Sequence, residues 1–257
     1  MAFPTSKSNL VDNVDDVMAD HINNIEDKVG IDGDTETTSL DYILKKGWIN
    51  IGTLTRTSDT TATLSGNWTD RIQKGDKLRW LSDGSLRQNY VIGVSYSSPN
   101  TTITITGGYQ TIANDSRFEE GKTITVPQIS KIENPQGFPG FFKWTPTYGG
   151  SGSMTYTDVI TYDIGFRIQG KAVTFYLNCG GTTGETANNY LTFSAPVAAV
   201  KVANTFGGGC VVYDGGFKSG FFYIATGPVF RVFKYDGSNY ALGTNKQIVV
   251  FDTYEMA

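Results

Sequence analysis

The chain has 257 residues, only 18 % of which are charged, and its formal net charge is −4. No segment is basic enough to follow a phosphate backbone, and no run of about 18 apolar residues is present, so the sequence argues against nucleic-acid binding and membrane insertion. Its two cysteines, Cys179 and Cys210, are too few for a disulfide framework. The 30 Gly, 14 Tyr and 15 Phe residues are typical of a mainly β protein with many tight turns.

Residues 1–46 are predicted to form a helical attachment or trimerisation segment. Apolar residues recur there every three or four positions, which is the spacing of one face of an amphipathic helix. The opposite face is rich in Asp and Asn, which are poor helix formers, so the helix alone would be marginal. We therefore expect its apolar face to pack against other copies of the helix, or against another protein, through Val11, Val14, Met18, Ile22, Ile25 and Val29. The alternative is a helix that packs on its own β-domain.

Residues 47–133 are predicted to form a small antiparallel β-barrel or sandwich. Apolar residues alternate there with polar ones, and Gly, Asn, Asp and Ser clusters recur about every ten residues without a helix between them. The pattern predicts strands at 48–54, 62–64, 77–80, 90–96, 101–106 and 123–129. The expected core residues are Trp68, Ile72, Leu78, Trp80, Tyr90 and Val94.

Residues 134–146 are the best candidate for a linker, because their prolines and glycines interrupt strands. Four aromatic residues are unusual for a free linker. We expect them to wedge between two domains: Phe138, Phe141, Phe142 and Trp144.

Residues 147–257 are predicted to form a second β-domain, a jelly-roll-like β-sandwich at the tip of the molecule. Gly170 and Lys171 separate two strand patterns, and Gly in first place is what a type II′ hairpin turn requires. The expected strands are 162–169, 172–178, 191–194, 210–213, 220–225, 229–234 and 247–254.

Side chains suited to catalysis are sparse. The single histidine, His21, lies in the acidic N-terminal segment without a nucleophile placed to pair with it. The sequence has no Cys/His cluster with zinc-site spacing and no glycine-rich phosphate loop. Glu185, Asp214 and Asp236 are candidates for the two catalytic carboxylates of a glycosidase. However, Asp in a glycine turn is usually present for its backbone preference. The sequence therefore predicts a non-enzymatic protein without a cofactor or a metal.

Two loops of the last domain place aromatic rings beside short polar side chains. A ring offers a flat apolar face, and Asp and Asn offer directional hydrogen bonds, a combination that suits a sugar. The candidate binding residues are Tyr213, Asp214, Phe217, Tyr235, Asp236, Asn239 and Tyr240. For any one of these residues, the alternative is a side chain that ends a strand and packs on its neighbours.

Several motifs resemble bacteriophage proteins. Residues 29–33 (VGIDG) and 37–42 (TTSLDY) resemble the opening segment of many tail-fibre and virion-appendage proteins, where it follows a short amphipathic helix. The middle of the chain is similar to a β-domain of phage structural proteins through SGNWT (65–69), KGD (74–76), VSYSSPNTT (94–102), GGY (107–109) and PQGFP (135–139). Residues 144–147 (WTPT) and 150–156 (GSGSMTY) resemble the β-sandwich tips of such fibres.

The resemblance implies a homotrimeric virion protein that is assembled in the host cytoplasm and exposed on the particle surface. Its N-terminal segment would attach to other virion proteins or trimerise, and its C-terminal domain would contact a host-surface glycan or protein. The alternatives are a purely structural tail, baseplate, head-fibre or capsid component, a glycan-degrading spike, and a secreted carbohydrate-binding module.

Overall fold

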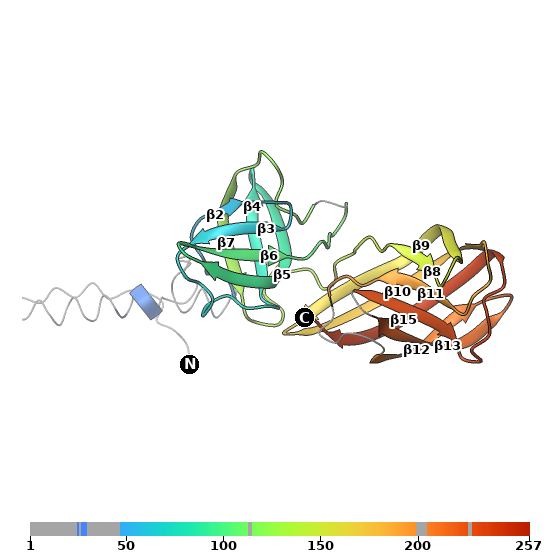
Figure 1. Cartoon of the computed structure of the whole chain (residues 1–257). Coiled ribbons are helices and arrows are strands. Elements are labelled where there is room, and N and C mark those ends of the chain that lie inside the picture. Colours follow the sequence, from blue (N-terminus) through green and yellow to red (C-terminus); the bar gives the residue numbers. More distant parts are fainter. Residues whose placement is uncertain (1–24, 26, 30–46, 113–114, 199–204, 226–227) are drawn as a thin grey trace, which may run out of the picture.

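The computed structural model describes residues 25, 27–29, 47–112, 115–198, 205–225 and 228–257. The chain is mainly β, as predicted, and its strands form a seven-stranded and an eight-stranded antiparallel sheet. Figure 1 shows a compact barrel beside a longer second domain. Of the six predicted oligomerisation residues, Val11, Val14, Met18 and Ile22 lie outside the described residues, so the helical stripe and the trimer stay predictions. Ile25 is exposed and Val29 is partly exposed.

The first sheet is a nearly closed barrel with the strand order β1-β7-β4-β5-β6-β3-β2. Its two end strands, β1 and β2, are neighbours in the sequence: β1 pairs with β7, β2 pairs with β3, and the Ile51 N–H donates to the Pro127 carbonyl at 3.2 Å. A single stretch of chain therefore completes both edges. The strands are β1 (Ile49–Asn50), β2 (Leu54–Arg56), β3 (Thr61–Ser65), β4 (Lys77–Ser82), β5 (Ser85–Ser97), β6 (Asn100–Ile105) and β7 (Ile124–Ser130).

Alternating residues of the barrel strands point into one hydrophobic core. Trp80 lies 4.7 Å from Phe118 between ring centroids, and both are fully buried. Four of the predicted core residues are buried: Ile72, Leu78, Trp80 and Tyr90. The other two, Trp68 and Val94, are partly exposed and pack against the core. Tyr90 differs from the others because it belongs to the core of the second domain.

The second sheet has the order β8-β11-β14-β13-β12-β15-β10-β9 and folds over its own core. Phe175 of β10 lies 4.8 Å from Phe230 of β14 and 6.2 Å from Phe193 of β11, although these strands are far apart in the sheet. The two layers expected of a sandwich are therefore halves of one sheet. The strands are β8 (Tyr148–Gly150), β9 (Thr155–Gln169), β10 (Ala172–Gly184), β11 (Tyr190–Ser194), β12 (Thr205–Tyr213), β13 (Phe217–Ala225), β14 (Val229–Lys234) and β15 (Gly243–Glu255).

The turn between β9 and β10 is the predicted hairpin, with Gly170 at φ +58° between the paired residues Gln169 and Ala172. It abuts the barrel: a Cβ on Gly75 would lie 1.9 Å from the Gly170 carbonyl oxygen. Lys74 also donates to the main-chain oxygen of Ala257 at 2.7 Å, which places the C-terminus at the junction (Figure 1). This end of the second domain is therefore fixed against the barrel.

Two of the four aromatic residues of the 134–146 segment, Phe138 and Phe142, pack against Tyr90 between the two sheets, whereas Phe141 is 41 % exposed. The Phe142 main chain pairs with Phe166 of β9, and its buried ring lies 5.2 Å from Tyr90 of the barrel. Trp144 is also buried, and its indole N–H donates to the Ser194 carbonyl at 3.1 Å. The segment is an integral part of the domain junction.

Candidate functional site

The antiparallel register gathers the loops of the second domain at the end remote from the barrel. Tyr213 at the end of β12 pairs with Gln247 near the start of β15, and Thr183 near the end of β10 pairs with Gly243 of the same strand. The end of β14 pairs with the early part of β13. The fold thus brings together both predicted aromatic loops and a third connection. We call these three connections, with the strand ends Tyr213 and Phe217 that flank the second of them, the distal loops: residues 185–189, 213–217 and 235–242.

Asp214 ties the distal loops together from beneath. Its side chain is 3 % exposed, and its two oxygens lie 2.9 Å from Lys234 Nζ and 2.8 Å from Lys246 Nζ. The Ala241 N–H also donates to this carboxylate at 3.1 Å. Burial alone raises the pKa of Asp214, but the contacts with the two lysine ammonium groups and the hydrogen bond from the Ala241 amide outweigh it and hold the pKa at about 2. Asp214 is therefore a buried anchor, and its burial takes it out of the predicted contact surface.

Tyr240 is also removed from that surface, because its side chain is fully buried. Its N–H donates to the Asn188 carbonyl at 2.8 Å, and its ring centroid lies 5.3 Å from Lys234 Nζ. Burial raises the pKa of Tyr240 well above its ordinary value. Sequence composition placed Tyr240 with the surface rings because its neighbours resemble a polar turn, yet this ring fills the core beneath the loop.

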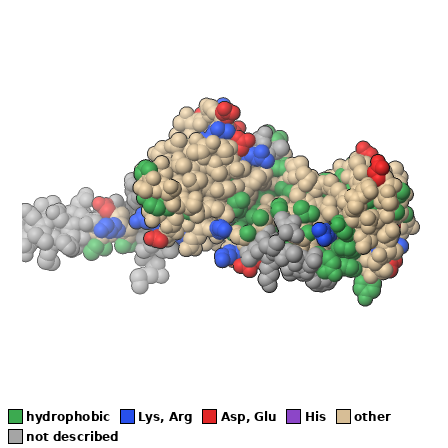
Figure 2. Space-filling view, viewed as in Figure 1, with side chains coloured by type: hydrophobic (Ala, Val, Ile, Leu, Met, Phe, Trp, Pro, Cys, Tyr) green, Lys and Arg blue, Asp and Glu red, His purple; other side chains and the backbone are tan. Residues whose placement is uncertain are grey.

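The other predicted residues remain at the surface. Phe217 and Tyr235 are 74 % and 78 % exposed, and Tyr213, which is partly exposed, supports Phe217 edge-to-face at 5.2 Å. Asp236 is exposed, and its side chain accepts hydrogen bonds from the Ser238 amide and hydroxyl, which lower its pKa. In Figure 2, hydrophobic side chains gather toward the end of this domain that is farther from the barrel. The arrangement is a raised aromatic surface with polar groups beside it.

Asn239 connects two of the distal loops. Its side-chain amide donates to the Ala187 carbonyl at 3.4 Å, and the residue is exposed. The main-chain oxygen of Asn239 accepts a hydrogen bond from Lys234 Nζ. The lysine that neutralises Asp214 thus also fixes the conformation of the exposed loop above it.

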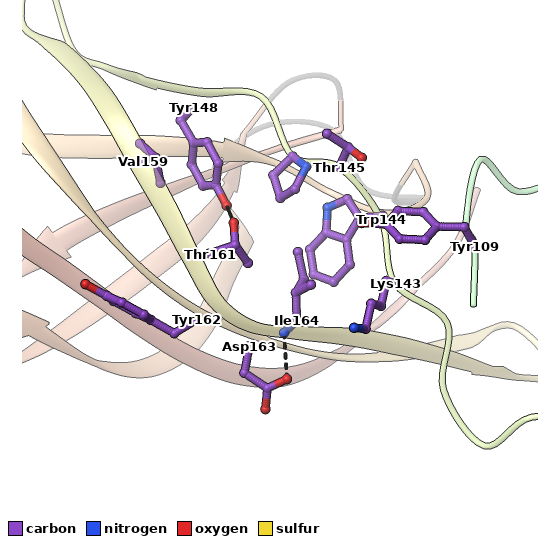
Figure 3. A pocket seen from close by; sticks show the side chains of 11 residues that line it. Tyr109, Lys143, Trp144, Thr145, Tyr148, Val159, Thr161, Tyr162, Asp163 and Ile164 are labelled. Atoms are coloured by element: carbon purple, nitrogen blue, oxygen red, sulfur yellow. Dashed lines mark hydrogen bonds between the residues drawn. The ribbon is translucent and has the colours of Figure 1, made fainter. Parts of the chain in front are cut away.

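A pocket that the sequence did not predict lies nearer the barrel (Figure 3). Its volume is about 430 Å³, and its walls come from the barrel, the 134–146 segment, β8 and β9. Tyr109, Trp144, Tyr148 and Tyr162 line it together with hydroxyl groups and two charged side chains. Trp144 was expected to pack between domains, but nothing in the sequence places Tyr109 beside β9, because the two are joined only by the fold.

No set of three or more His, Cys, Asp or Glu side chains is placed to hold a metal ion within the described residues. In that same part of the chain, no helix has the length and apolar character needed to cross a membrane. His21 lies outside the described residues.

Comparison with protein-family models, with curated proteins and with solved structures gave no significant match.

Proposed function

We propose that the protein is a non-enzymatic structural component of a bacteriophage appendage, whose C-terminal domain contacts glycans on the host surface through the distal loops. The observation that carries the proposal is the pair of exposed rings, Phe217 and Tyr235, held over a buried ion-paired anchor at the free end of the domain. The motif resemblances to phage structural proteins supply the biological context. The virion location rests on those resemblances.

The chemistry of the distal loops suits a weak saccharide contact. A pyranose ring presents an apolar face to Phe217 or Tyr235, and its hydroxyls bond to Asp236 and Asn239 beside them. Because Asp214 and its lysines fix the loops in advance, little conformational entropy is lost on binding. The same ion pairs occupy the Asp214 carboxylate, which supports a binding role over a glycosidase role.

Avidity gives such a weak site its strength. Linked sites bind with an effective concentration set by their geometry, so three copies in one trimer bind far more tightly than one. The proposed trimer forms through the stripe that includes Ile22. Light scattering of the full chain should give three times the 28.0 kDa chain mass, and Ile22→Asp should reduce it by burying a charge. A variant that keeps the trimer would refute the stripe as its core.

An array of purified bacterial surface polysaccharides tests the glycan contact. We expect the full-length protein to bind one class of polysaccharide, and the variant with Phe217→Ser and Tyr235→Ser to lose at least about tenfold in affinity with an unchanged melting temperature. Tyr96→Ser, which removes an exposed ring from the barrel, is the matched control and should bind normally. Equal binding by the distal variant, or no binding by the unaltered protein, would refute the proposal.

A purely structural role is the second candidate, and one observation favours it. The outer face of the second sheet carries an apolar strip in which Val211 pairs with Val249, beside Phe251, which is 68 % exposed. Contiguous exposed apolar area of this kind is typical of protein contacts. If another virion protein covers this strip, Phe251→Asp should reduce incorporation of the chain into particles while the polysaccharide array stays unchanged.

A further inference from the structure

The junction pocket is built by residues from both domains. The main chains of Tyr109 and Lys143 exchange two hydrogen bonds, of 2.9 Å and 2.7 Å, which hold a barrel loop against the segment that leads into β8. Tyr109 and Trp144 lie at one end of the pocket and Tyr162 of β9 at the other (Figure 3). A molecule in this pocket therefore contacts the barrel and the second domain together.

The pocket is lined by residues of β8 and β9, which are the two end strands of the second sheet. Strand β8 has only three residues, and β9 contains a β-bulge beside it: Asn178 pairs with Asp163 and Cys179 pairs with Thr161, so Tyr162 has no partner on β10. A bulge bends a strand and redirects its side chains, and bulges are common next to functional sites. Here the bulge places Tyr162 at the surface, 53 % exposed, on the rim of the pocket.

Two of the four rings of the pocket, Trp144 and Tyr148, are held by hydrogen bonds. The Trp144 indole N–H is bonded to the Ser194 carbonyl, and the Tyr148 hydroxyl is bonded to Thr161 Oγ1 at 2.9 Å. Burial raises the pKa of Tyr148 far above neutrality, so this hydroxyl stays protonated and the pair offers neutral hydrogen-bonding groups. Such rigid rings need no ordering when a ligand arrives.

The charges of the pocket cancel. Lys143 and Asp163 both line it, and Figure 3 shows them on the same side, away from the Tyr148–Thr161 pair. Asp163 Oδ1 accepts a hydrogen bond from the Ile164 N–H at 2.9 Å, which fixes the carboxylate. One cation and one anion on a single wall favour a neutral ligand with several hydroxyls over an anion or a cation.

We propose that this junction pocket binds a neutral saccharide of one or two pyranose rings. Aromatic walls suit the apolar face of such a ring, while the Tyr148–Thr161 hydroxyls, Lys143 and Asp163 suit its hydroxyl groups. A volume of about 430 Å³ is at the lower end of the range for small-molecule sites, which excludes a long glycan chain inside it. The site shares no residue with the distal loops and stands independently of the function proposed for them.

Saturation-transfer NMR on the full-length protein tests the proposal with a panel of single sugars. The neutral probes are glucose, galactose, N-acetylglucosamine, maltose and lactose, and the charged comparators are glucuronic acid and glucosamine. We expect at least one neutral sugar to bind and the charged forms of the same ring to bind at least about tenfold more weakly. Absence of binding by every neutral sugar, or preference for a charged one, would overturn the proposal.

Variants then assign the bound sugar to the pocket. Tyr109→Ala and Asp163→Asn alter partly exposed or exposed side chains and should each weaken binding by about tenfold or more, whereas Tyr96→Ala, an exposed ring on the barrel, should not change it. A melting temperature equal to that of the unaltered protein shows that each variant is folded. If both pocket variants bind normally, and the distal Phe217→Ser and Tyr235→Ser variant does not, the sugar belongs to the distal loops and the pocket proposal fails.

Discussion

Asp214 forms a buried ion-paired cluster with Lys234 and Lys246. Among the described residues, Asp214 is the only acidic member of this cluster, so Asp214→Asn removes its only negative charge. Both lysines are nearly inaccessible, with side chains 3 % and 7 % exposed. The substitution therefore leaves two buried ammonium groups without their counter-ion, while the size of the side chain hardly changes. Breaking a buried ion pair in this way costs about 3 to 5 kcal/mol of unfolding free energy.

The pH dependence gives this prediction a distinctive form. The pKa of Asp214 is about 2 in the folded protein, below its ordinary value of 3.8, so its ionisation contributes about 2 kcal/mol of stability above pH 4. That contribution is lost as the pH falls through the pKa of Asp214 in the folded protein. The difference in unfolding free energy between the unaltered protein and Asp214→Asn should therefore become smaller below about pH 4.

Urea denaturation followed by near-ultraviolet circular dichroism, repeated between acid and alkaline pH, measures both effects. Asp236→Asn is the matched control because Asp236 is exposed in the same loop region, and its stability should change by less than about 0.5 kcal/mol. A loss below about 1 kcal/mol for Asp214→Asn at neutral pH would show that the anchor is not energetically important. A loss independent of pH would refute the ion-pair explanation.

Two further substitutions and a labelling test probe the packing. Gly75→Ala should destabilise the domain junction by about 2 kcal/mol or more, because the new Cβ would overlap the Gly170 carbonyl; Gly84→Ala has a similar φ but open space around it, and calorimetry should show only the smaller backbone strain. Burial raises the pKa of the Cys179 and Cys210 thiols to about 11 and about 12, so iodoacetamide at pH 8 should label them only after unfolding, as mass spectrometry will show. Cys179 is buried and Cys210 is partly exposed, so rapid labelling of Cys179 in the folded protein would contradict its burial.

Local sequence signals located most strands because side-chain alternation is a local property. The predicted strands at 77–80, 101–106 and 229–234 coincide with β4, β6 and β14 within two residues. The prediction missed β8, which is short and glycine-rich, and the first half of β9, where two register shifts disturb the alternation. Bulges and brief edge strands depend on partners elsewhere in the chain, so a two-residue period does not reveal them.

The sequence predicted which residue types make up the candidate site, but not which of these residues are buried. The loops around Phe217 and Tyr235 have a turn composition that marks them as exposed, which the structure agrees with. Asp214 is paired with lysines on two other strands, and Tyr240 packs into the core of the second domain, so the local sequence does not reveal the burial of either residue. The junction pocket combines a barrel loop with β9, and only the tertiary fold brings these together.

The stretch that completes both edges of the barrel also constrains the order in which the chain can fold during synthesis. Ile49 pairs with Ile129, so the first strand made must wait for the last strand of the barrel before its pairing is complete. Closing so long a loop costs chain entropy, and contacts of this range are formed late. Until β7 emerges, β4 lacks one neighbour and the growing sheet has an open edge, which is a template for pairing with another chain. Nascent chains arrested before Ile124 should therefore aggregate through this open sheet edge, whereas chains released after Ser130 should not aggregate in this way.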